Sequence, residues 1–136
     1  MKTNLLGIFT VAALTASAAF AQSSTRVQAN VPFDFIVGNR TLPAGEYKVM
    51  SQGPAPGTVM IQAADGKGAV ILLALPLYSV VERHGGKLVF HRYSDTYFLS
   101  EIWGPGNEGR RIRTTSRERE LATKAAPGNT TVAALR

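Results

Sequence analysis

Closely spaced turn residues restrict what this chain can fold into more than any other feature. The 136 residues include 13 glycines and 7 prolines, many of them in clusters such as Pro43-Ala44-Gly45, Gly85-Gly86 and Gly104-Pro105-Gly106. Glycine and proline interrupt helices, and these clusters are typical of tight turns. Most stretches between the clusters have the length of a β-strand. The sequence therefore predicts many short strands joined by turns.

Most of these stretches alternate apolar and polar residues, which is the pattern of a strand with one buried face. In 46–50, for example, Tyr47 and Val49 share one face. The run Ala69–Leu73 is apolar without alternation, which predicts a strand buried on both faces. The expected strands are 26–31, 33–37, 40–42, 46–50, 58–63, 68–75, 78–83, 87–93 and 96–103.

One short helix is expected near the C-terminus. Thr115 and Glu118 fit a capping box, in which the threonine accepts from the first amides and the glutamate returns the bond. The helix should run from Ser116 to about Ala126, because Pro127-Gly128 stops it. The residues after it, 130–135, form either a closing strand or a frayed tail.

These elements predict an all-β fold. We expect an antiparallel β-sandwich or small barrel of about seven or eight strands with one short C-terminal helix. The sequence does not distinguish sandwich from barrel. A single β-rich domain should cover residues 22–126, because a domain of this size can bury a usable core. Residues 127–136 are then a C-terminal tail or the closing strand.

Residues 1–21 have the three parts of a cleavable secretory signal peptide. Lys2 supplies the positive start, an apolar stretch follows, and Ala19 and Ala21 supply small side chains before a cut at Gln22. The apolar stretch is shorter than the roughly 20 residues that span a bilayer. We therefore expect an exported protein, periplasmic or extracellular, with no transmembrane segment in the mature chain.

Composition restricts the chemistry of the domain. The chain has no cysteine, which excludes disulfides, thiolate catalysis and cysteine-based metal sites. Lys and Arg number 15 against 9 Asp and Glu, and five arginines lie within 110–119. This excess favours an anionic partner, contacted by Arg110, Arg111 and Arg113, whereas the simpler interpretation is a solvated basic segment. Nucleic acid is not expected as a partner of an exported protein.

Residues 87–103 have the clearest hairpin pattern, with Ser94-Asp95 as a two-residue loop. This loop pairs Arg92 with Tyr97, Phe90 with Leu99 and Leu88 with Glu101. The aromatic side chains gathered here are expected to form part of the hydrophobic core, so the stability of the domain should depend strongly on this hairpin. The alternative is a surface that contacts a ligand or partner. Its candidate contact residues are His91, Arg92, Tyr93, Tyr97 and Trp103.

The sequence offers few residues for catalysis. It contains no G-x-S-x-G elbow, no H-E-x-x-H motif and no phosphate-binding glycine loop. A metal site that joins His84 to Asp95 is disfavoured, because the strand between them spans roughly 23 Å. Nothing in the sequence brings Asp34 and Glu101 together as a carboxylate pair for sugar chemistry. We therefore predict no catalytic residue, no metal and no cofactor.

Five segments stand in a distinctive order along the chain: Val31–Gly38, Leu42–Val49, Leu88–Tyr93, Tyr97–Leu99 and Ser116–Ala122. In these segments the chain resembles a family of short exported β-rich proteins of unknown function from soil bacteria. The resemblance covers most of the chain after the signal peptide. It implies an all-β exported domain, and it implies nothing about mechanism.

Three functions remain open at this point. The leading hypothesis is an exported non-catalytic domain that binds a cell-envelope component, such as a polysaccharide, or a protein partner. The second is a small β-barrel carrier, for which an apolar ligand would need a deep apolar cavity. The third is a metal-dependent or hydrolytic enzyme centred on His91, where three or more polar groups should then converge on a cleft.

Overall fold

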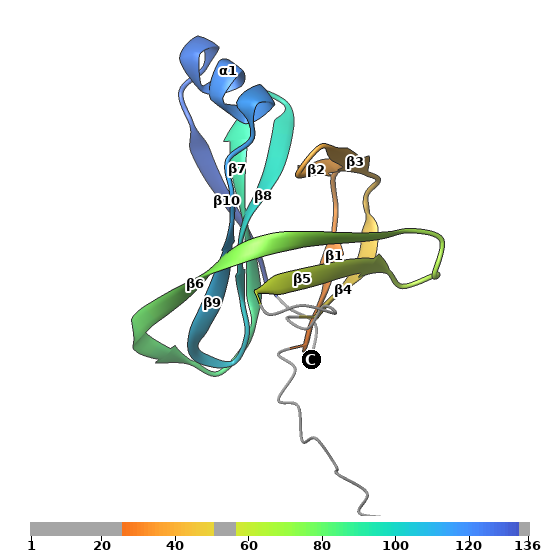
Figure 1. Ribbon diagram of the computed structural model, residues 1–136, viewed down its shortest axis with the longest axis vertical. Coiled ribbons are helices and arrows are strands. Elements are labelled where there is room, and N and C mark those ends of the chain that lie inside the picture. Colours follow the sequence, from red (N-terminus) through yellow and green to blue (C-terminus); the bar gives the residue numbers. More distant parts are fainter. Residues whose placement is uncertain (1–25, 51–56, 134–136) are drawn as a thin grey trace, which may run out of the picture.

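The fold is all-β with a C-terminal helix, as predicted (Figure 1). The computed structural model describes residues 26–50 and 57–133, so the predicted signal peptide and its cut at Gln22 lie outside the described residues. The described elements are β1 (Arg26–Val31), β2 (Phe35–Val37), β3 (Arg40–Leu42), β4 (Gly45–Met50), β5 (Thr58–Ala63), β6 (Ala69–Arg83), β7 (Lys87–Tyr93), β8 (Thr96–Trp103), β9 (Gly106–Ile112), α1 (Ser116–Lys124) and β10 (Gly128–Ala133).

The long strand β6 connects two parts of a single sheet. Its first part pairs with β5 and its second part with β9. The strand order is β1-β4-β5-β6-β9-β8-β2-β3, and β7 pairs with both β8 and β10. Among the described strands, only β2 and β8 pair in parallel, so the sheet is mixed. In Figure 1, β6 crosses in front of the other strands, and α1 lies at the far end of β7 and β8.

The hydrophobic core lies inside this bent sheet. Phe90, which is completely buried, packs edge-to-face against Phe33 and Phe35, with ring centroids 5.0 and 5.4 Å away. β1 also lies near β7 and β10, so the sheet curls back toward its first strand and encloses one core. The largest fully buried side chains are Phe35, Phe90, Ile61, Leu88, Val31, Val37, Val49 and Val59.

β6 replaces two predicted strands, 68–75 and 78–83. Pro76 was expected to separate them, but it stands inside the ladder opposite Arg110. A proline lacks the amide hydrogen that a strand flanked on both sides needs. The pairing of β6 with β5 ends at Leu73, so Pro76 has its neighbouring strand on the β9 side. One continuous strand therefore accommodates the proline.

The prediction that Ala69–Leu73 is buried on both faces is wrong. Val70 is buried and Leu72 partly buried, whereas Ile71 is 53% and Leu73 66% exposed. The run is apolar because both faces of β6 carry apolar side chains, and only one face packs on the core. The outward face remains open to solvent.

The C-terminal third contains a strand that the sequence did not predict. β9 has the sequence GNEGRRI, which lacks an apolar alternation, yet it pairs with both β6 and β8. The helix was predicted correctly, with Thr115 Oγ1 accepting from the Glu118 amide at 3.3 Å. Of the two alternatives for the last residues, the closing strand is present, because β10 pairs with β7. Within the described residues, no helix is long and apolar enough to cross a membrane.

Candidate functional site

The five hairpin residues predicted as contact candidates do not form one site. Arg92 and Tyr97 stand opposite each other on one face, with the guanidinium 5.6 Å from the ring centroid. His91 and Tyr93 lie on the other face, toward α1. Trp103 is at the far end of the hairpin, where its ring meets Arg83 at 4.5 Å. The hairpin therefore presents three separate environments.

A β-bulge changes the register of the hairpin. Phe90 pairs with Leu99 and Arg92 with Tyr97, as predicted. The predicted partner of Leu88 was Glu101, but Leu88 pairs with Ile102, because the register shifts between Val89 and Phe90. Ser100 is the extra residue that this shift leaves on β8. Bulges redirect side chains, and Ser100 Oγ lies 3.1 Å from His91 Nε2.

Four polar side chains from three elements form a connected network around His91. Its Nδ1 lies 2.7 Å from Glu118 Oε1, and its Nε2 lies 3.1 Å from Ser100 Oγ. Tyr93 donates its hydroxyl hydrogen to the same glutamate oxygen at 3.1 Å. The two bonds fit an imidazole that donates from Nδ1 and accepts at Nε2. We call these four residues, Ser100, His91, Glu118 and Tyr93, the His91 network.

The His91 network is mostly buried beneath α1. The Glu118 side chain is 7% exposed, and the His91 side chain is 33% exposed. Leu121 and Ala125 of the helix pack beside the network on Ile36, Tyr93 and Phe98. A buried carboxylate requires partners for its charge, and His91 and Tyr93 supply them. The network therefore attaches the first turn of α1 to the hairpin.

The environment of Tyr93 favours its neutral form. Burial is the larger cause and the negative charge of Glu118 the second, and together they raise the pKa of the Tyr93 hydroxyl. A raised pKa means that the folded state holds the phenolic proton more tightly than the unfolded chain. This contribution to stability is full below about pH 10, the ordinary tyrosine value, and is lost as the pH rises through the folded-state pKa.

The acidic candidates Asp34 and Glu101 have separate partners. Asp34 accepts from the Ala44 amide at 2.9 Å, in the turn before β4. Glu101 accepts from the Trp103 indole at 2.8 Å and from Arg111 at 3.3 Å. His84 is exposed between β6 and β7. No three His, Asp or Glu side chains within residues 26–50 and 57–133 are grouped so that they could hold a metal ion.

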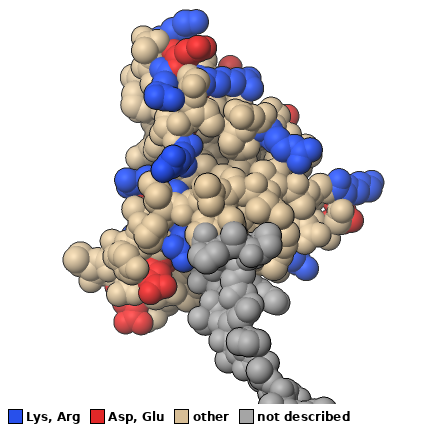
Figure 2. All heavy atoms as spheres, viewed as in Figure 1, with Lys and Arg blue, Asp and Glu red and all other residues tan. Residues whose placement is uncertain are grey.

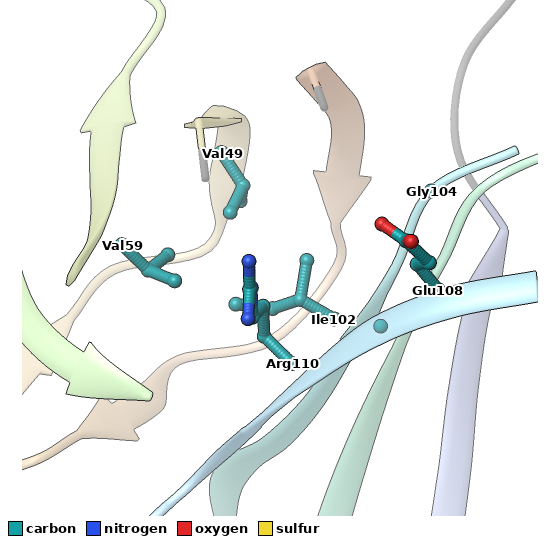
Figure 3. Close-up of a pocket in the computed structure, with 7 residues that line it drawn as sticks. Val49, Val59, Ile102, Gly104, Glu108 and Arg110 are labelled. Carbon is teal, nitrogen blue, oxygen red and sulfur yellow. The ribbon is translucent and has the colours of Figure 1, made fainter. Parts of the chain in front are cut away.

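The three arginines predicted as anion contacts lie in different surroundings. Arg110 points inward, and Figure 3 shows its side chain among Val49, Val59 and Ile102 at a small pocket. This pocket has a volume of about 20 Å³, enough for about one water molecule. Arg111 is exposed and pairs with Glu101, while Arg113 is exposed at the end of β9. Only the last two are available to a partner.

The outward side of β6 carries an exposed apolar row that we call the outer face of β6. Ile71 is 53%, Leu73 66% and Leu75 46% exposed, and these three residues form the face. Figure 2 shows a broad uncharged area where β6 crosses the molecule, with Lys and Arg side chains around it. Soluble domains rarely expose contiguous apolar surface without a partner for it. Tyr78 and Val80 are also exposed, but side chains alternate along a strand, and Tyr78 stands opposite Glu108 on the other side of β6.

Sequence reasoning missed the His91 network and the exposure of the outer face of β6. The hydrogen bonds that join Ser100, His91 and Glu118 depend on a bulge and on the docking of a helix, and neither leaves a local pattern in the sequence. The outer face of β6 did leave a signal, the unbroken apolar run, but this run was interpreted as a strand buried on both faces.

No protein-family model, curated protein or solved structure matches the chain.

Proposed function

We propose that this chain is an exported, non-catalytic domain that binds a component of the cell envelope through the outer face of β6. The observation that carries the proposal is the exposure of that apolar row, because leaving large aliphatic side chains in water is unfavourable. The signal-peptide pattern of residues 1–21 supports export. A partner that covers the row removes this apolar surface from water.

A carrier of an apolar ligand has less support. A carrier needs an internal cavity of several hundred Å³. The pocket between Val49, Val59 and Ile102 has a volume of about 20 Å³, far too small for such a ligand. A larger pocket of about 460 Å³, lined by Leu42, Tyr47 and Lys67 among others, is open to solvent and lies beside the turns before β4 and β6, so it does not enclose a ligand. The interior side chains of the bent sheet pack on one another instead. The apolar surface available for binding is therefore on the outside.

The test is binding of the purified mature protein to washed envelopes of the producing cell. We expect the wild-type protein to sediment with the envelopes and the variant L73E/L75E to remain in solution. Two charges on the outer face oppose its burial but leave the core untouched, so both proteins should melt alike. The matched control is N129E/T131E, which adds the same charges to exposed positions on β10. Equal sedimentation of L73E/L75E and the control would contradict the proposal.

A second candidate function is acyl transfer at Ser100, favoured by the connectivity of the His91 network. The serine and the carboxylate bind opposite nitrogens of one imidazole, which is the arrangement that activates a serine nucleophile. In such a step Ser100 Oγ attacks an ester carbonyl, and His91 takes the serine proton and passes it to the leaving alcohol. Water then attacks the acyl-serine carbonyl and gives a proton to His91, and His91 passes that proton to Ser100 Oγ as the carboxylic acid leaves.

A fluorophosphonate probe distinguishes this candidate from a structural network, because it reacts only with an activated serine. Acyl transfer predicts labelling at Ser100 that is lost in His91→Ala. Ser100 is buried, and a purely structural network predicts no labelling of the folded protein. Labelling that persists in Ser100→Ala would assign the reaction to another residue.

A further inference from the structure

We infer that the occupant of the outer face of β6 is an anionic lipid surface, an inference that rests on the proposed function and names its partner. The face consists of Ile71, Leu73 and Leu75, and two arginines, Arg111 in β9 and Arg113 directly after it, flank it.

Strand pairing places the arginines beside the leucines. Leu75 stands directly opposite Arg111 on β9, and directly opposite residues of an antiparallel pair point to the same side. Arg113, which directly follows the end of β9, lines a surface depression of about 270 Å³ together with Leu73 and Leu75. Both guanidiniums are exposed, and Arg111 also pairs with Glu101 of β8 at 3.3 Å. The depression therefore has leucines on its floor and the positive charge of Arg113 at its rim.

The opposite side of β6 has a different charge. Tyr78 stands directly opposite Glu108, and both share the side of Pro76 and Arg110, not that of Leu75 and Arg111. Glu108 is exposed. An anionic surface is therefore attracted to the side that carries Leu73 and Leu75.

Aliphatic side chains edged by arginine fit a lipid leaflet. Leucine and isoleucine can enter the acyl region, while an arginine keeps its stem along the apolar surface and its guanidinium at the phosphates. The outer face of β6 also lacks the aromatic anchors that are enriched in protein interfaces. Each cation near an anionic leaflet strengthens binding about fivefold. The surface around Leu73 and Leu75 therefore supplies both contributions to membrane binding, which are burial of apolar side chains and electrostatic attraction by the neighbouring arginines.

The experiment is co-flotation of the purified mature protein with vesicles of phosphatidylcholine alone or with added phosphatidylglycerol. We expect flotation with the phosphatidylglycerol vesicles only, weakened by salt, because screening shortens the range of the attraction. R111Q/R113Q should lower the partition coefficient roughly 25-fold, at about fivefold for each charge removed. Leu73→Glu should lower it about tenfold or more by opposing apolar burial.

The matched control is R117Q/R119Q, which removes the same charge from exposed positions on α1, away from the face. This control should float like the wild type. Equal flotation with neutral vesicles, or an equal loss in both double variants, would overturn the inference. If the protein binds envelopes through Leu73 and Leu75 but floats with neither vesicle, the lipid inference fails while the proposed function stands. The partner is then a protein or polysaccharide of the envelope.

Discussion

Replacing Phe90 with alanine should destabilise the domain more than any other substitution in the hairpin. Phe90 is completely buried, lies opposite Leu99 on β8, and contacts Phe33 and Phe35 with its ring. Truncating a buried phenylalanine costs about 3–5 kcal/mol in the free energy of unfolding. A domain of this size has a total of about 5–15 kcal/mol. Phe90→Ala should therefore leave a large fraction unfolded, which urea denaturation followed by circular dichroism measures.

Two controls separate cavity formation from other effects. Phe90→Leu keeps most of the buried volume and should lose clearly less stability than Phe90→Ala. Leu73→Ala removes a comparable aliphatic group from the solvent-exposed outer face of β6 and should change the free energy of unfolding by about 0.5 kcal/mol or less. An equal loss in Phe90→Ala and Leu73→Ala would contradict the position of the core. His91→Ala should fall between them, because its side chain is partly exposed.

Replacing Gly109 with alanine should have the second largest effect. Gly109 stands directly opposite Trp103, whose ring lies over the glycine. A methyl group at residue 109 would lie 2.5 Å from the Trp103 ring, closer than real side chains approach, so the ring or strand β9 must move. Overpacking of this kind typically costs about 1–3 kcal/mol. Thermal melting should show the loss, and the fluorescence of Trp103, the chain's single tryptophan, should report the displaced ring.

The contact with Trp103 can be isolated by a double-mutant cycle. In a Trp103→Leu background the ring is absent, so adding Gly109→Ala should cost much less than it does in the wild type. Gly85→Ala is the control for adding a methyl group to a glycine, because nothing lies within 4 Å of its new carbon. Additive effects of the two substitutions would show that the ring does not constrain residue 109.

The sequence predicted those parts of the fold that depend on local patterns. Alternation located the strands around Tyr47 and Phe90, and the capping box located the start of α1 at Ser116. β9 was missed because its buried residues are Gly109 and Ile112, and a glycine gives no apolar signal. Pro76 was given too much weight, since a strand with one neighbour tolerates a proline.

The candidate sites were harder to predict because they depend on how elements pack together. His91 was correctly placed in a strand, but its partners Ser100 and Glu118 reach it through a bulge and a docked helix. The capping box was expected to use the Glu118 carboxylate, whereas that carboxylate binds His91 and Tyr93. For Ile71 and Leu73 the sequence showed an apolar run, and only the fold shows that its outward side is left exposed by the strands and helix of the described residues.

The most direct test of the central claim, that the domain binds through the outer face of β6, is an amide NMR titration of the labelled mature protein with vesicles containing phosphatidylglycerol. We expect line broadening centred on Ile71, Leu73 and Leu75 and on the neighbouring Arg111 and Arg113, with little change in α1. Broadening centred instead on His91, Tyr93 and Ser100, with the β6 signals unaffected, would contradict it and would move the binding site to the His91 network.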